Sequence, residues 1–180
     1  MSTAFPKKYS HNFELDMYTA WHAQGCFSPE EVKKMTGRTP KGQFMISMPP
    51  PNVTGVLHLG HALMIAVEDT MVRYHRMMDF ETLWVPGTDH AGIATQVVVE
   101  RQLAEHNQSK EDLGREKFLT KMREWVDYSR STIIGQTMRM GSSCDRSREQ
   151  FTMSEKLSRA VRKSFKTLYN KGKIYQDTYM

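Results

Sequence analysis

The chain has 180 residues, 39% of them hydrophobic and 25% charged, which is enough for one domain with a buried core. Its net charge of +5 is compatible with a polyanionic partner but does not require one. No apolar run approaches the roughly 20 residues of a membrane span, and residues 1–10 have no signal-peptide core. Cys26 and Cys144 lie far apart without a C-x-x-C pair, which argues against a structural zinc site and for a reducing, cytoplasmic location.

Residues 1–43 are polar and contain several prolines and glycines, so we expect this segment to be largely irregular. One short helix is expected at 28–35, because Ser28 can cap it and Pro29 suits its first position.

Two short strands flank a helix in the next part of the chain. The sequence QFMISM at 43–48 predicts a strand that Pro49 ends, because proline cannot donate to a β-ladder. Residues 58–78 predict a largely buried helix, and TLWVP at 82–86 predicts the second strand.

The second half of the chain reads as mostly helical. Helices are expected at 93–105 and over a long region at 113–140. Thr152 and Glu155 predict a capping box for the last helix, and residues 173–180 predict the beginning of another strand. The last helix carries an apolar stripe of Leu157, Val161, Phe165, Leu168 and Tyr169.

The order strand, helix, strand predicts a βαβ unit with a parallel pair of strands and an α/β fold. Ligands of such sheets bind at the carboxyl ends of the strands. Two unusual segments, at 49–61 and 86–92, follow the two predicted strands directly. We therefore expect both segments to contribute to one ligand site.

The first segment, PPPNVTGVLHLGH, combines features that suit a nucleotide triphosphate. Its prolines stiffen the exit from the strand, and Gly55 allows a turn or the close approach of a ligand. His58 and His61 lie three residues apart at a helix start, where free N–H groups already favour phosphate. Gly60 between them leaves a flat patch for a planar ring.

Other interpretations of this segment stay open. The chain has neither the G-x-x-x-x-G-K-[ST] phosphate loop nor the G-x-G-x-x-G dinucleotide motif. Two histidines at a helix start can simply be held by local hydrogen bonds, and a zinc site would need a third ligand.

The second segment, GTDHAG, places Asp89 at the end of a strand. A carboxylate there suits an ammonium group or Mg²⁺. Alternatively, Asp89 caps the helix that follows.

The segment PPPNVTGVLHLGHAL resembles the first signature of the class I aminoacyl-tRNA synthetases, whose core has the form His-x-Gly-His. Together with LWVPGTDHAGIATQVVVER, it resembles the valine-specific members of that family. The similarity also includes GREKFL, REWV and REQFTMSEKLSRAV, and so covers most of the chain from about Phe13 onward.

The resemblance implies the first half of a Rossmann-like nucleotide-binding fold with parallel strands and additional helices. It implies that residues 44–180 are the N-terminal half of the catalytic domain and that residues 1–43 are an extension packed on it. The family's editing insertion, Lys-Met-Ser-Lys-Ser loop and anticodon-binding domain do not occur in these 180 residues, so we expect weak or no activity from this chain alone.

The activity that the resemblance implies is ATP-dependent activation of valine, followed by transfer of the valyl group to tRNA(Val). His58 and His61 would be the catalytic residues. The residues implied for ATP are Asn52, Thr54, Gly55, His58, Gly60 and His61. Those implied for valine are Pro50, Pro51, Asn52 and Asp89. Mg²⁺ would accompany ATP without a metal site in the protein, the full-length enzyme would be a monomer, and no membrane would be involved.

One position departs from the family pattern, and two other functions stay open. Arg146 stands where the family usually has tryptophan, which puts local packing in doubt. A non-catalytic chain could still bind ATP or the tRNA acceptor end, and a small nucleotidyltransferase shares a related turn, although GTDHAG argues against it. A basic surface for phosphates, or an ordinary solvated helix face, is formed by Lys156, Arg159, Arg162, Lys163 and Lys166.

Overall fold

The structure is a computed structural model that describes residues 8–178. Its elements in chain order are α1 (Asn12–Ala23), α2 (Pro29–Thr36), β1 (Gln43–Ser47), α3 (Leu59–Met77), β2 (Glu81–Val85), β3 (Gly87–Thr88), α4 (Gly92–Glu105), α5 (Lys110–Arg139), a 3₁₀ turn η1 (Arg146–Arg148), β4 (Gln150–Phe151) and α6 (Glu155–Asn170).

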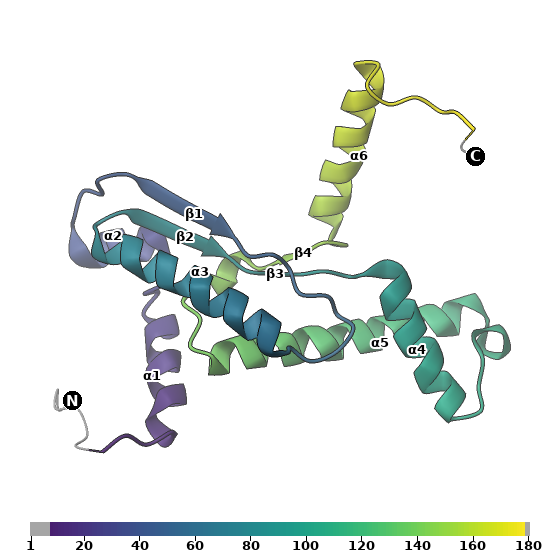
Figure 1. Ribbon diagram of the computed structural model, residues 1–180, viewed down its shortest axis with the longest axis horizontal. Helices are drawn as coiled ribbons and strands as arrows, with labels where there is room; N and C mark the ends of the chain where they lie inside the picture. Colours follow the sequence, from purple (N-terminus) through teal and green to yellow (C-terminus); the bar gives the residue numbers. More distant parts are fainter. Residues whose placement is uncertain (1–7, 179–180) are drawn as a thin grey trace.

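Strands β1 and β2 form the predicted parallel pair. Their register runs from Gln43 opposite Glu81 to Ser47 opposite Val85, and α3 lies across one face of the pair (Figure 1). The short strands β3 and β4 form a second parallel pair that continues from the end of β2. The βαβ unit inferred from the hydrophobic pattern is therefore confirmed.

The core lies between the β1–β2 pair and α3. Trp84 is fully buried and packs with Met48, Ile65, Val72 and Cys144. Alternation along β2 explains this placement, because every second side chain of a strand points to the same face. The Trp84 indole N–H donates to Glu68 Oε2 at 2.9 Å, and burial raises the pKa of that carboxyl above its usual range.

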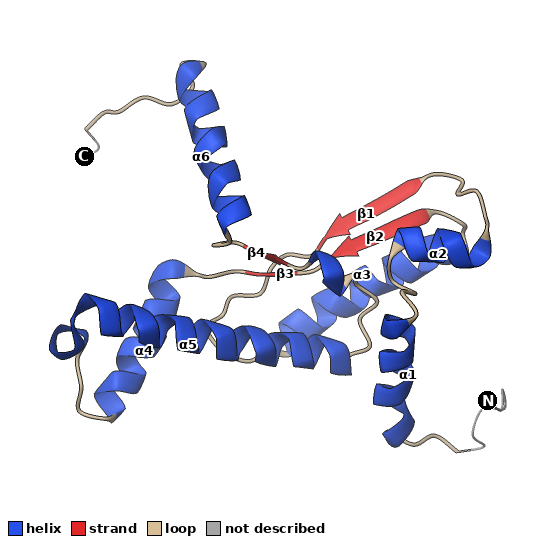
Figure 2. Cartoon of the chain, turned by 180° about the vertical axis from the view of Figure 1, so that it is seen from behind, coloured by secondary structure: helices blue, strands red, loops and turns tan. Residues whose placement is uncertain are grey.

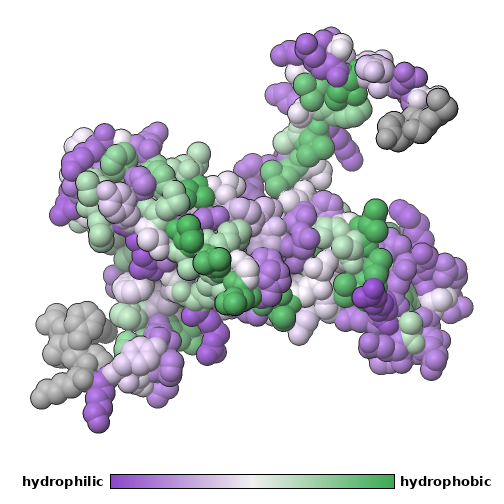
Figure 3. Space-filling view, viewed as in Figure 1, coloured by the Kyte–Doolittle hydropathy of each residue, from purple (hydrophilic) through white to green (hydrophobic). Residues whose placement is uncertain are grey.

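Helix α3 has the predicted bounds to within one residue at each end, but it is not largely buried as expected. Ile65 and Val72 are buried, whereas Leu59, Leu63 and Val67 expose 85%, 66% and 53% of their surface. Apolar surface accordingly lies open over α3 in Figure 3. The physical reason is that two strands cover only one stripe of a helix, and the described chain places nothing against the opposite stripe.

Helix α1 was not anticipated, since residues 1–43 were expected to be irregular outside the short helix now observed as α2. Tyr18 anchors α1 on the body of the protein: its ring is buried and its hydroxyl donates to the Ser142 carbonyl at 2.8 Å. Gly25, at a φ of 72°, turns the chain after α1. These contacts suit the expected packing of the N-terminal extension, but the division into domains stays a prediction.

The segment that follows α5 is buried and carries the departure from the family pattern. Arg146 donates from Nε to the Tyr18 hydroxyl at 3.1 Å and from Nη2 to Thr137 Oγ1 at 2.9 Å. Arg76 donates from Nη2 to the Ser143 carbonyl at 2.7 Å, and its burial lowers its pKa to about 10. Polar partners from α1 and α5 thus satisfy the arginine at position 146.

The long region predicted at 113–140 is helical, and it belongs to α5. Ser109 and Asp112 cap its start, while Gly114 interrupts the helical conformation with a φ of 71°. Seen from behind, α5 runs along the body of the protein with α4 packed against it (Figure 2).

The last helix begins later than expected and projects from the body (Figure 1). Its N-cap is Ser154, whose hydroxyl accepts from Leu157 N–H, so the predicted capping box of Thr152 and Glu155 is wrong. Its apolar stripe is largely exposed, with Val161 at 67% and Phe165 at 59%. The expected strand is also absent from the described part of 173–180, which ends at residue 178; the last two residues lie outside the described range. Within residues 8–178, no helix combines the length and apolarity that crossing a membrane requires.

Candidate functional site

The segment that follows β1 forms one wall of a cavity at the carboxyl ends of the parallel strands. The cavity has a volume of about 460 Å³. It is lined by Pro49, Pro50, Pro51, Asn52, Thr54, Gly55, Val56, Leu57, His58, His61 and Met64. Most of the residues proposed for ATP and valine therefore lie around one space, whereas Gly60 and Asp89 do not line it.

Backbone hydrogen bonds join this segment to the second predicted loop. Asn52 and Asp89 form a parallel β-bridge, in which Asp89 N–H donates to the Pro51 carbonyl at 2.8 Å and Val53 N–H donates to the Asp89 carbonyl at 2.9 Å. The two loops thus lie side by side, as the sequence predicts. They do so because β1 and β2 are adjacent and parallel.

Helix α5 holds the segment from the other side. The Trp125 indole N–H donates to the Val53 carbonyl at 2.8 Å, and Leu57 N–H donates to Gln136 Oε1 at 2.8 Å. Val53 is fully buried. These contacts fix the loop before a ligand arrives, which lowers the ordering cost of binding.

The two histidines are tied to the start of α3 through their Nδ1 atoms. Gly60 N–H donates to His58 Nδ1 at 3.1 Å, and His58 N–H donates to His61 Nδ1 at 3.2 Å. Because each Nδ1 accepts, the neutral rings carry their protons on Nε2. The local hydrogen bonds considered as an alternative are therefore present, and they leave two N–H donors for an anion at a helix N-terminus.

His61 is expected to make stability depend on pH. Burial and, secondarily, the neighbouring His58 lower the pKa of His61 below 6.5. The unfolded chain therefore takes up the proton first, so the free energy of unfolding should fall as pH drops below about 6.5 toward 5. Denaturant unfolding at pH 7.5 and 5 should show a smaller loss for His61→Asn, which keeps an acceptor and does not titrate.

The control for this experiment is His106→Asn, which removes an exposed histidine at the end of α4. Its pH dependence should stay closer to that of the wild type. If both variants lost stability in parallel with the wild type, His61 would not be the group responsible.

The glycines of the segment differ in what the structure requires of them. A Cβ on Gly60 would lie 2.9 Å from Cε1 of His58, so any larger residue would require the His58 ring to move. Gly55 does not adopt a positive φ, and a Cβ there would meet no atom within 4 Å. The turn at this position therefore does not itself require glycine, and the predicted contact of Gly60 with adenine stays a prediction.

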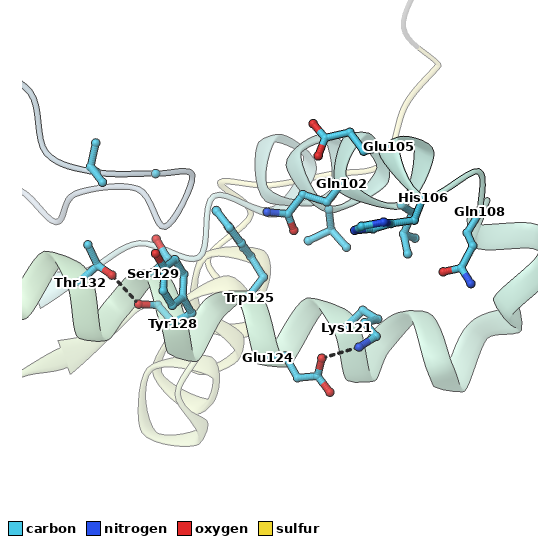
Figure 4. A pocket seen from close by; sticks show the side chains of 14 residues that line it. Gln102, Glu105, His106, Gln108, Lys121, Glu124, Trp125, Tyr128, Ser129 and Thr132 are labelled. Atoms are coloured by element: carbon cyan, nitrogen blue, oxygen red, sulfur yellow. Dashed lines mark hydrogen bonds and ion pairs between the residues drawn. The ribbon is translucent and has the colours of Figure 1, made fainter.

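A larger cavity lies between α4 and α5, and neither His58 nor His61 lines it. It measures about 770 Å³ and shares only Gly55 and Val56 with the first one. Figure 4 shows Trp125 of α5 pointing toward Gln102 of α4, above the ion pair of Lys121 and Glu124 at 2.8 Å. We assign the candidate site to the smaller cavity, because the two histidines predicted to bind phosphate line it at the start of α3.

Metal-ligating side chains do not gather in the part of the chain that the structure describes. No group of three or more histidine, cysteine, aspartate or glutamate side chains is placed to hold an ion there. Both cysteines are free; Cys144 is buried in the core and Cys26 is half-buried.

Sequence reasoning missed three residues that organise the site: Trp125, Gln136 and Thr152. Each acts on the loops from a distant part of the chain; Gln136, for example, lies 79 positions after the residue it binds. No local spacing indicates such contacts. A tryptophan in a charged helix was the one available signal, because an indole N–H usually finds a partner when it is half-buried.

Comparison with known proteins gives a consistent result. The family model described as tRNA synthetases class I (I, L, M and V) matches residues 16–180. A chloroplastic/mitochondrial valine–tRNA ligase of Arabidopsis thaliana is 50% identical over 174 residues, which cover 97% of this chain and 17% of that protein. The valine–tRNA ligase of Syntrophotalea carbinolica is 51% identical over 178 residues, covering 98% and 19%. The chain thus spans less than a fifth of the length of these relatives.

A solved structure shares the fold. The LeuRS in a ternary complex with tRNA and LeuAMS, from Agrobacterium radiobacter K84, superposes with a TM-score of 0.71 at 20% sequence identity. The match covers 94% of this chain and 19% of the LeuRS chain. At this identity the similarity supports the α/β, Rossmann-like architecture alone.

Proposed function

Because this chain belongs to the class I tRNA synthetases, we propose that it forms the ATP- and valine-binding part of a valyl-tRNA synthetase (valine–tRNA ligase). The observation that carries the proposal is the cavity at the ends of β1 and β2, where His58 and His61 stand at the start of α3 beside Pro50, Pro51 and Asn52.

In the proposed reaction, the valine carboxylate attacks the α-phosphate of ATP and pyrophosphate leaves. The Nε2–H groups of His58 and His61 donate to phosphate oxygens, which gain negative charge as the bond to pyrophosphate breaks. The N-terminus of α3 adds its dipole to the same charge. Mg²⁺ bound to ATP supplies further neutralisation of the phosphates.

The remaining residues position the substrates. Asn52, Thr54 and Gly55 lie along the ATP side, and Gly60 leaves room for adenine. Pro50 and Pro51 form a stiff apolar edge for the valine side chain, while Asp89 accepts from the α-ammonium group. Positioning supplies most of the catalysis, since phosphoryl and adenylyl transfer need little acid–base chemistry from the protein.

Binding of valyl-sulfamoyl adenosine, a stable analogue of valyl-adenylate, tests this proposal. We expect the 180-residue chain to bind it in titration calorimetry, and to bind the isoleucyl analogue less tightly because an extra methylene must be accommodated. Valine-dependent ATP–pyrophosphate exchange should be weak or undetectable, because the sequence contains no Lys-Met-Ser-Lys-Ser segment. Failure to bind the valyl analogue, or equal affinity for both analogues, would contradict the proposal.

A second candidate is a chain that binds the tRNA acceptor end without catalysis. The exposed basic residues of α6 favour it, since the helix projects from the body with Arg159, Arg162 and Lys163 in solvent. Salt-sensitive tRNA binding by a chain that does not bind the adenylate analogue would favour this second function. A cytoplasmic location and a monomeric enzyme stay predictions.

A further inference from the structure

The hydroxyl of Thr152 lies between the two polar residues of the second loop. Thr152 Oγ1 is 2.7 Å from Asp89 Oδ1, 2.6 Å from His90 Nδ1 and 2.9 Å from the backbone nitrogen of His90. His90 Nδ1 is itself 3.4 Å from Asp89 Oδ1. Three polar groups from residues 89 and 90 therefore converge on one oxygen that is more than sixty positions away in sequence.

The chemistry of a hydroxyl fixes the direction of these hydrogen bonds. A threonine hydroxyl has one proton to donate and two lone pairs to accept with. A carboxylate can only accept, so the hydroxyl proton points to Asp89. Both lone pairs of the Thr152 hydroxyl oxygen then accept hydrogen bonds, one from the backbone N–H of His90 and one from its ring Nδ1. His90 consequently carries a proton on Nδ1, in contrast to the tautomer assigned to His58 and His61.

The sheet holds Thr152 in place for this contact. It follows β4 directly, and its backbone N–H donates to the Thr88 carbonyl at 3.2 Å, next to the pairing of Thr88 with Phe151. Asp89 is fixed from its other side by the bridge to Asn52. The carboxylate thus has little freedom to rotate, and within residues 8–178 no protein group hydrogen-bonds its second oxygen, Oδ2.

We propose that Thr152 is a positioning residue for the amino acid substrate. It holds Asp89 through Oδ1 and so leaves Oδ2 to accept from the α-ammonium group of valine. This inference rests on the proposed function, because it assigns a role in amino-group recognition to a residue outside the two loops. It also explains why Thr152 does not cap α6: its hydroxyl is used in the site, and Ser154 caps the helix.

The amino group's contribution to binding can be isolated with a pair of probes. One is valyl-sulfamoyl adenosine, and the other is isovaleryl-sulfamoyl adenosine, identical except that hydrogen replaces the α-amino group. The ratio of their dissociation constants, measured with the full 180-residue chain, reports amino-group recognition alone. Thr152→Val, which removes the hydroxyl at nearly constant shape, should reduce this ratio roughly tenfold, whereas Thr152→Ser should keep it.

The possible outcomes distinguish a failure of the positioning role of Thr152 from a failure of the proposed function. If the wild type prefers the amino probe and Thr152→Val keeps that preference, the positioning role is wrong while the function stands. If Thr152→Val weakens both probes equally, Thr152 is only structural and the inference is overturned. If the wild type does not bind the amino probe or does not prefer it, the proposed amino-acid site fails, and this inference fails with it. Thr120→Val removes an exposed hydroxyl from α5 and should leave the ratio unchanged.

Imidazole nitrogen NMR of the wild type provides a second test that does not depend on a variant folding. We expect His90 of the wild type to be protonated at Nδ1. A wild-type His90 protonated at Nε2 alone would overturn the arrangement around Thr152.

Discussion

Replacement of Trp84 by alanine is expected to lower the free energy of unfolding by about 3–5 kcal/mol. Trp84 is fully buried between the β1–β2 pair and α3, so truncation removes the largest side chain of the core and leaves a cavity. It also removes the partner of Glu68, a carboxylate whose pKa burial already raises. Since a domain is stable by only about 5–15 kcal/mol, the variant should be close to unfolded at room temperature. Urea unfolding followed by circular dichroism measures this loss.

Two matched variants show whether the effect belongs to the core. Trp84→Phe keeps most of the apolar volume and should lose clearly less than Trp84→Ala. Trp21→Ala removes a half-buried tryptophan from α1 and should also cost less. An equal loss for Trp21→Ala and Trp84→Ala would mean that the β1–β2–α3 unit does not contain the main core.

The parts of the fold that the sequence predicted are those that local chemistry determines. The strand predicted at 43–48 is observed at Gln43–Ser47, shortly before Pro49 removes a donor, and the helix predicted at 58–78 from its apolar periodicity is observed at Leu59–Met77. Parallel pairing then follows from the order of the elements, and it brings the two unusual loops together. For the same reason the smaller cavity is lined by the residues that the segment PPPNVTGVLHLGH predicts.

The predictions that failed are of two kinds. One concerns a side chain with two possible hydrogen-bond partners, and the other concerns apolar helix faces that no other part of the described chain covers. Thr152 has the spacing of a helix cap, but Asp89 and His90 compete for the same hydroxyl and hold it. Part of the apolar surface of α3, including Leu59 and Leu63, and most of the apolar stripe of α6 have the pattern of buried faces, yet nothing in the described chain covers them. Periodicity indicates which face a helix can bury, and only the tertiary structure decides whether that face is covered.

The two histidines can combine a structural role with the proposed chemical one. Sequence reasoning weighed local hydrogen bonds against phosphate binding as alternatives, whereas the observed bonds use only Nδ1 of each ring and leave Nε2 available for the proposed phosphate contact. Nδ1 of each ring accepts from the backbone at the start of α3, and this fixes the proton on the outward Nε2. The capping contacts are therefore what prepares both rings to donate to an anion.

Asp89→Asn is expected to have the largest effect on ligand binding. The substitution keeps the shape of the side chain and an oxygen for Thr152, but it removes the negative charge proposed to face the α-ammonium group. The preference for valyl-sulfamoyl adenosine over its isovaleryl counterpart should fall about 30-fold or more, since loss of one partner of a hydrogen-bonded charge pair costs ~2 kcal/mol or more. Titration calorimetry with both probes measures this change.

Asp127→Asn is the matched control, because it neutralises an exposed carboxylate on α5 and should leave the preference intact. Affinity for the isovaleryl probe should change little in Asp89→Asn, since that probe has no amino group. An undiminished preference in Asp89→Asn would place the ammonium group elsewhere. The proposal predicts a large loss in Asp89→Asn and a smaller one in Thr152→Val, because in it the carboxylate contacts the ammonium group and the hydroxyl acts only through the carboxylate.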